Sequence, residues 1–194
     1  PYNPMLTTYY AAGRLPFEGM FPFGSLEEIA SRYDAHVIAG TAVKAVRAAD
    51  KAVVTEDGTE RTYDKILIAT GASAFVPGSF GGLKGAFCMR TVEDAVKLHD
   101  AVAARHYKNA VVVGASMVGI KVAELLYKQG THVTLADMAP HIFALAAYPE
   151  VSEIIEERIR AMGMDIAFGQ AITAAEEHCD EQGNVTGYTV QTAV

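Results

Sequence analysis

The sequence predicts an α/β fold, with a βαβ unit in the second half of its 194 residues. The β-branched run at 110–113 is followed by a turn of small residues and then by apolar residues at helical spacing. A second run of strand-forming residues spans 131–136, directly after Gly130, which can end a helix. Helical and strand patterns alternate again through 151–168, and this alternation is typical of strands joined by helical crossovers.

The first half of the chain is predicted to contain two helices and a small antiparallel meander. A helix-compatible run ends at Gly13, a loop rich in Pro, Gly and Phe follows, and Ser25 with Glu28 forms a capping box that opens a second helix. The run 64–71 is predicted to be a buried strand that ends in a glycine turn. The strands of the meander are predicted at 35–38, 42–47, 51–55 and 61–63.

In the second half, Thr91 and Asp94 form a capping box, and 95–105 has the apolar spacing of an amphipathic helix. This helix leads into the strand at 110–113. A further helix is predicted at 151–162, with one apolar face made of Val151, Ile154, Ile155, Ile159 and Met162. Short strands are predicted at 165–168, 171–174 and 188–192.

Composition excludes several classes of protein. Hydrophobic residues make up 51% and charged residues 20% of the chain, a balance typical of soluble globular proteins. The net charge of −7 and the lack of a Lys/Arg-rich run argue against binding to nucleic acid. No apolar stretch approaches the roughly 20 residues that span a bilayer, and no charged leader opens the chain, so a cytoplasmic protein is expected. Cys88 and Cys179 lack partners at metal-binding spacing, so we expect two buried, small apolar side chains and no metal site.

The turn that follows the strand at 110–113 has the residue types of a dinucleotide-binding site, although Ser116 replaces the middle glycine of the motif. Gly114 allows the sharp strand-to-helix turn, the small residue at 116 lets the backbone approach a pyrophosphate, and Gly119 lets helix and strand pack closely. Phosphates would lie at the helix N-terminus, where unpaired N–H groups and the helix dipole favour an anion. The candidate NAD-binding residues of this turn are Gly114, Ser116, Met117, Val118 and Gly119.

Asp137 supplies the second part of the nucleotide-binding prediction. It follows the strand at 131–136 and lies near the ~20-residue offset from Gly114 at which an acidic group accepts hydrogen bonds from an adenosine ribose. A carboxylate there would repel a 2′-phosphate, and Met138 offers no arginine to compensate, which favours NAD(H) over NADP(H). The alternative is a βαβ unit whose glycines serve only packing and whose Asp137 caps a turn.

A second motif precedes the glycine turn: Tyr63-Asp-Lys-Ile-Leu-Ile-Ala-Thr-Gly-Ala72. Together the two motifs resemble those of the pyridine-nucleotide-dependent flavoprotein oxidoreductases, and the resemblance covers nearly the whole chain. It implies a Rossmann-like NAD(P)-binding domain with a three-layer ββα arrangement at 86–194, lacking its last strand. It also implies part of an FAD-binding domain of the same plan at 1–85. The glycine- and proline-rich stretch 77–85 is predicted from its composition to be the linker between the two halves. The residues that the resemblance places against FAD are Val43, through its backbone, and Ala69, Thr70 and Gly71.

Two departures from the family pattern refine the resemblance. Disulfide-using and peroxide- or oxygen-reducing members carry a redox cysteine on the FAD side, whereas the corresponding segment here, 4–8, has none. The chain therefore resembles the cysteine-free branch, which includes rubredoxin, ferredoxin and nitrite reductase flavoproteins. Lys121 stands where many members have a glutamate close to the nicotinamide, so an amine there reverses the local charge. A solvated lysine on the helix surface is the alternative.

The family's FAD half begins with its own glycine-rich turn, and none precedes Pro1, so the chain is expected to be a fragment of a longer enzyme. The resemblance implies that the whole protein passes hydride from NADH to FAD and electrons onward to a separate acceptor, either a small redox protein or a small molecule. It also allows a homodimer, with no membrane partner. The fragment alone is expected to bind NADH weakly, to retain no flavin and to be inactive, and the sequence assigns no catalytic residue. The alternatives are a non-catalytic NAD(H)-binding or redox-sensing module, and a fold that binds another adenosine ligand such as a methyl donor.

Overall fold

The computed structural model describes residues 1–193 and divides into two compact units. One unit spans Phe23–Ser73, and the other combines Tyr2–Pro22 with the chain from Ala74 onward. Residues near the N-terminus therefore group with the second half of the chain and not with the meander. The assignment of the two halves, divided after residue 85, to two cofactor domains stays a prediction.

The smaller unit consists of a short helix and a three-stranded antiparallel sheet of order β1-β2-β3. Its elements are α2 (Leu26–Arg32), β1 (Val43–Arg47), β2 (Ala52–Thr55) and β3 (Glu60–Thr62). The predicted capping box is present, because the Ser25 hydroxyl accepts a hydrogen bond from Glu28 N at 3.1 Å and the Glu28 carboxylate accepts one from Ser25 N at 2.7 Å. The predicted meander is confirmed by strands β1, β2 and β3, but the strand predicted at 35–38 is not formed.

Residues 64–71 do not form the predicted buried strand. They have no regular secondary structure, and the side chains of Leu67 and Ile68 are 88% and 66% exposed. A strand needs a neighbouring strand to take its backbone hydrogen bonds, and no sheet within residues 1–193 includes this run. Gly71 does adopt the left-handed backbone of a turn, with φ of +75°.

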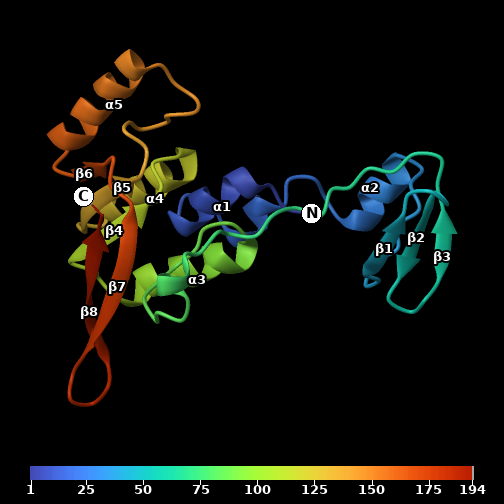
Figure 1. The fold of residues 1–194 in the computed structure, drawn as a ribbon, viewed down its shortest axis with the longest axis horizontal. Helices are drawn as coiled ribbons and strands as arrows, with labels where there is room; N and C mark the ends of the chain where they lie inside the picture. The colour runs from blue at the N-terminus through green and yellow to red at the C-terminus, as the bar shows by residue number, and fades with distance from the viewer. Residues whose placement is uncertain (194) are drawn as a thin grey trace. The chain divides into compact units, whose positions relative to one another are not determined.

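The larger unit is built on a parallel sheet of order β4-β5-β6 (Figure 1). Its strands are β4 (Asn109–Val113), β5 (His132–Asp137) and β6 (Asp165–Phe168). The register pairs Val112 with Leu135 and Leu135 with Ile166, which aligns apolar side chains across the sheet. The crossover helices are α4 (Met117–Lys128), between β4 and β5, and α5 (Pro149–Ala161), between β5 and β6. The predicted α/β alternation is therefore confirmed.

Further helices and a hairpin belong to the larger unit. The predicted capping box opens α3, since Asp94 N donates to the Thr91 hydroxyl at 3.2 Å and Thr91 N donates to the Asp94 carboxylate at 3.0 Å. Helix α1 packs against both α3 and α4 (Figure 1). Strands β7 and β8 pair as an antiparallel hairpin that is longer than predicted. The bounds are α1 (Pro4–Ala11), η1 (Phe17–Met20), η2 (Gly78–Phe80), α3 (Val92–Ala104), β7 (Ile172–Cys179) and β8 (Val185–Thr192).

The core of the larger unit lies between the helices and the parallel sheet. Its buried apolar side chains include Leu98, Val102, Leu126, Val133 and Leu135. Burial of a side chain of this size stabilises a fold by roughly 1.5–3 kcal/mol. Because the core includes residues of β4, α4 and β5, it fixes the end of one strand against the start of the helix that follows.

The apolar face predicted for α5 is partly wrong. The side chains of Val151 and Ile154 are 48% and 68% exposed, whereas Ser152 and Glu156 are buried. The Glu156 carboxylate accepts a hydrogen bond from Ile142 N at 3.0 Å, and the Ser152 hydroxyl donates to Ile142 O at 2.7 Å. The face of α5 that carries Ser152 and Glu156 is therefore the buried one. Its two hydrogen bonds to Ile142 anchor the loop that follows β5.

The two cysteines are not the buried side chains that the sequence predicts. Cys179 is exposed at the end of β7, where its sulfur lies 3.7 Å from the Glu177 carboxylate, and Cys88 is half-buried; both are free thiols. Within residues 1–193, no group of three His, Cys, Asp or Glu side chains could hold a metal ion. None of the helices in this part of the chain is long and apolar enough to cross a membrane.

Candidate functional site

The turn between β4 and α4 has the geometry that its residue types predict. Gly114 has φ of +108°, a conformation that L side chains rarely adopt, and its N–H donates to the Ala136 carbonyl at 2.8 Å. A Cβ added to Gly119 would lie 1.7 Å from the Gly114 carbonyl oxygen. Only glycine at position 119 therefore lets the helix approach the turn this closely.

Ser116 is the N-cap residue of α4. Its backbone is extended, and its hydroxyl accepts a long hydrogen bond, 3.5 Å, from Gly119 N. Ser116, Met117 and Val118 are exposed, so the first turn of α4 lies at the surface. The N–H groups and the dipole of a helix N-terminus suit an anionic group such as a pyrophosphate.

Ser116→Ala is expected to lower the free energy of unfolding by about 0.5–1 kcal/mol, the lower end of the range for a lost N-cap because the present hydrogen bond is long. Ser116→Gly is expected to cost only a few tenths of a kcal/mol, since glycine is tolerated at an N-cap. Urea unfolding of the parental chain and both variants measures these differences. Equal destabilisation by the two substitutions would contradict the capping role.

Asp137 connects the end of β5 to the glycine turn. Its Oδ2 accepts a hydrogen bond from Ala115 N at 2.6 Å, and its Oδ1 accepts one from Ala139 N at 2.8 Å. The turn-closing role that the sequence left as an alternative is therefore present. A carboxylate can accept about four hydrogen bonds, so lone pairs remain for a ribose hydroxyl. The contact with a ribose stays a prediction.

The loop after β5 borders the same turn, a contact that the sequence analysis missed. Phe143, whose φ is +54°, donates from its N–H to the Ala115 carbonyl at 3.2 Å. Its neighbour Ile142 is fully buried and is held by Ser152 and Glu156 of α5. The sequence feature that could have revealed this contact is the pair Ser152 and Glu156, two polar residues that lie four positions apart on an amphipathic helix.

The residues predicted to contact FAD lie in the smaller unit. Val43 begins β1 and is 56% exposed. Ala69, Thr70 and Gly71 are exposed and belong to the irregular run that follows the meander. These residues belong to a different compact unit from the glycine turn, and their role toward FAD stays a prediction.

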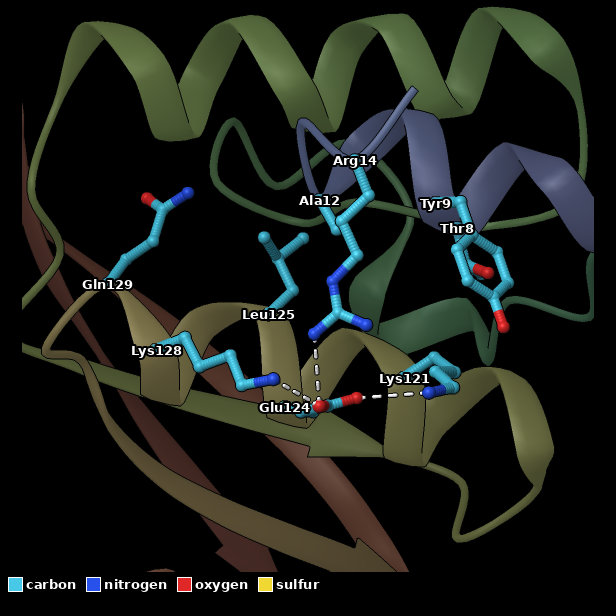
Figure 2. Close-up of a pocket in the computed structure, with 9 residues that line it drawn as sticks. All are labelled: Thr8, Tyr9, Ala12, Arg14, Lys121, Glu124, Leu125, Lys128 and Gln129. Carbon is cyan, nitrogen blue, oxygen red and sulfur yellow. Dashed lines mark hydrogen bonds and ion pairs between the residues drawn. The ribbon is translucent and has the colours of Figure 1, made fainter. Parts of the chain in front are cut away.

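Lys121 is held by two contacts and is not simply solvated. Its ammonium donates to Glu124 Oε2 at 3.1 Å and lies 5.6 Å from the centre of the Tyr9 ring. Arg14 and Lys128 donate to the other oxygen of the same carboxylate (Figure 2). These hydrogen bonds lower the pKa of Glu124 to about 2, and the bond from Lys128 is the largest cause, followed by that from Lys121.

The chain is expected to lose stability as the pH falls from about 4.5, the ordinary pKa of a glutamate, toward about 2, the folded pKa of Glu124. A carboxyl group whose pKa is lowered by folding stabilises the folded state at pH values above the pKa that the group has in the unfolded chain. This contribution is lost as the group becomes protonated. Glu124→Gln should be less stable at neutral pH and should lack this part of the acid dependence. Urea unfolding across that pH range checks this, with the exposed Glu150→Gln as control. An unchanged pH profile in Glu124→Gln would overturn the assignment.

Residues 2–193 match the family model of the pyridine nucleotide-disulphide oxidoreductases. The chain belongs to this family. The sequence prediction of a family of FAD- and NAD(H)-dependent oxidoreductases with a Rossmann-like α/β fold is thereby confirmed.

Three relatives show how far the likeness extends. The epsilon subunit of the NADH-dependent phenylglyoxylate dehydrogenase of Aromatoleum evansii is 32% identical over 181 residues, which cover 91% of this chain and 41% of the relative. The 5,5'-dehydrodivanillate O-demethylase ferredoxin reductase subunit of Sphingobium sp. is 35% identical over 153 residues, covering 76% of this chain and 35% of the relative. The crystal structure of the covalent putidaredoxin reductase–putidaredoxin complex matches with a TM-score of 0.79 and 26% identity, covering 98% of this chain and 46% of that chain. The chain spans less than half of each of these proteins.

Proposed function

We propose that the chain supplies the NADH site and part of the FAD site of a longer flavoprotein oxidoreductase. The observation that carries this proposal is the closed turn from Gly114 to Gly119, with the Asp137 carboxylate bonded to its backbone. A backbone clear of side chains at 119 and an accessible N-terminus of α4 fit a pyrophosphate. The unused lone pairs of Asp137 fit an adenosine ribose, and its charge disfavours a 2′-phosphate, which supports NADH as the donor.

Residues 64–71 are proposed to pair as a strand of the FAD-binding domain in the longer protein. The apolar side chains at 66–68 are 41–88% exposed in this chain. An exposed apolar run of this kind is typical of a segment that another element covers. The residues that we assign to FAD are Val43, Ala69, Thr70 and Gly71.

The protein's part in the reaction is to bind and orient the cofactors. Bound FAD supplies the flavin that accepts hydride. In this chain the glycine turn, together with Met117 and Val118 in the first turn of α4, would hold the phosphates of the dinucleotide, and Asp137 would hold the ribose. Hydride transfer between two cofactors requires no general acid or base from the protein, which agrees with the lack of an assigned catalytic residue.

The acceptor is inferred to be a small redox protein. The names of the relatives support this inference, since one is a ferredoxin reductase subunit and another was crystallised with putidaredoxin. Helix α1 contains no cysteine, so it offers no thiolate to relay electrons. The same proposal places the protein in the cytoplasm, where the free thiols of Cys88 and Cys179 stay reduced. It also includes a homodimer, which a measurement of the mass of the longer protein in solution would test.

Anaerobic addition of NADH to the longer protein that contains this chain tests the proposed function. We expect the flavin absorbance to bleach with NADH and to bleach at least about tenfold more slowly with NADPH, because the carboxylate repels the 2′-phosphate. A protein that retains no flavin, or whose flavin NADH does not reduce, would refute the proposal. The chain of residues 1–194 serves as the control, with weak NADH binding, no flavin and no turnover. A yellow purified chain would overturn that last expectation.

A further inference from the structure

Three cations meet at one carboxylate in the larger unit, two of them from the same helix as the carboxylate and one from a segment far away in the sequence. Arg14 follows α1, whereas Lys121, Glu124 and Lys128 lie on one face of α4. The Arg14 Nη2 and the Lys121 Nζ each lie 3.1 Å from the Glu124 carboxylate, and the Lys128 Nζ lies 2.5 Å from it. Figure 2 shows the three cationic groups converging on Glu124 at the edge of a pocket that Tyr9 also lines.

This cluster carries two net positive charges, because three charged side chains surround a single ionised carboxylate. The surplus is notable in a chain whose net charge is −7. An ion pair that served only to join α1 to α4 would need a single cation opposite Glu124. The surplus charge instead matches a dianion.

Most of the donors in the cluster are unused. A guanidinium offers five N–H groups and an ammonium three, whereas each of the three side chains makes one hydrogen bond within residues 1–193. Glu124 holds all three cationic groups in place, so a ligand need not order them on binding. The side chains therefore present a pre-arranged set of charged donors beside the pocket.

The pocket beside the cluster is large enough for a small ligand. Its volume is about 60 Å³, whereas roughly 10–15 Å³ is enough for one water molecule. A small tetrahedral ion fits this space. An oxyanion of this shape can accept charge-assisted hydrogen bonds from several directions. It can therefore bind lysine and arginine side chains that approach it from different sides.

We propose that Arg14, Lys121 and Lys128, arranged around Glu124, form a binding site for a phosphate-type oxyanion on the face of α4 that contacts α1. The site uses side chains, whereas the glycine turn uses the backbone at the N-terminus of the same helix. The two sites therefore use different groups of the chain, and they come nearest to each other at Lys121, the position that the family resemblance places close to the nicotinamide. The ligand is either free phosphate or the phosphate group of a larger molecule.

Titration of the whole chain with sodium phosphate, at pH 7.5 and constant ionic strength, tests the site by calorimetry and by backbone amide NMR. We expect saturable binding with shifts at Arg14, Lys121 and Lys128, and a loss of affinity of about tenfold or more in the double variant Arg14→Gln/Lys128→Gln. The matched control is Lys97→Gln/Arg158→Gln, which removes two cations elsewhere in the same unit and should leave the affinity unchanged. Equal weakening in the control, equal shifts with chloride, or shifts confined to 114–119 would each overturn the proposal.

Because Arg14→Gln also removes a contact between α1 and α4, a second variant separates binding from folding. Arg14→Lys keeps the charge and should retain saturable phosphate binding. If the cluster served only to join the helices, Arg14→Gln would lower the melting temperature, and the parental chain would show no saturable phosphate binding. That pair of results would also refute the site. A parallel titration with phenyl phosphate distinguishes the two sources: tighter binding than inorganic phosphate supports the site as one for a larger phosphorylated molecule, and weaker binding supports it as one for the free ion.

Discussion

Gly119→Ala is expected to abolish NADH binding and to lower the free energy of unfolding of the larger unit by about 3 kcal/mol or more. The added Cβ would lie 1.7 Å from the Gly114 carbonyl oxygen, which is backbone and cannot rotate away as a side chain can. Relief requires α4 to move away from β4, and that movement opens the turn on which the pyrophosphate site depends. Thermal unfolding should show a fall in melting temperature of roughly 6–12 °C. Calorimetric titration with NADH should show no binding.

Gly187→Ala is the matched control for this substitution. Gly187 lies in β8 of the same unit, and a Cβ added there meets no atom within 4 Å. Its stability should change by less than about 0.5 kcal/mol, as for an ordinary surface substitution, and its NADH affinity should not change. A Gly119→Ala chain that kept both its stability and its affinity would show that the close contact of helix and strand is not what the site requires.

The nucleotide-binding turn could be predicted because its determinants are local. Gly114 has the positive φ that the turn demands, and Gly119 lies where a side chain would strike the backbone. The capping boxes that begin at Ser25 and Thr91 are local too, since each is completed within three residues. Patterns of this kind need no knowledge of the rest of the chain.

Burial could not be predicted with the same success, because it depends on what lies opposite a segment. The apolar run at 64–71 has the composition of a buried strand, but no strand within residues 1–193 pairs with it. On α5, the apolar Ile154 is exposed and the polar Glu156 is buried. A hydrophobic pattern carries no information about the backbone N–H of Ile142, to which Glu156 is bonded.

The cluster around Glu124 was missed for a related reason. Arg14 and Glu124 are 110 residues apart in the sequence, and only the packing of α1 on α4 brings them together. Lys121 and Lys128 lie three and four residues from Glu124 on one helix, a spacing that the sequence contains but that was not used, whereas the contact of Arg14 has no such signature. Long-range ion pairs of this kind follow from the fold and have no local signature.

Asp137→Ala is expected to lower NADH affinity by roughly 10–100-fold and to leave NADPH affinity nearly unchanged, so that the preference for NADH is lost. A hydrogen bond to a charged group contributes about 1.5–3 kcal/mol, and removing the carboxylate also removes its repulsion of a 2′-phosphate. The substitution leaves the N–H groups of Ala115 and Ala139 without their present acceptor. The free energy of unfolding should therefore fall by about 1–3 kcal/mol. Calorimetric titration with each dinucleotide measures the ratio of affinities, and urea unfolding measures the stability.

The ratio of the two affinities separates recognition of the ribose from damage to the turn. A distorted turn would weaken NADH and NADPH binding alike, whereas loss of the carboxylate changes one relative to the other. Asp165→Ala is the matched control, because Asp165 lies at the start of the neighbouring strand β6, beside His132, and should affect neither the ratio nor NADH affinity. If the parental chain bound NADPH as tightly as NADH, or if Asp137→Ala kept the parental ratio, Asp137 would serve only to close the turn through Ala115 and Ala139.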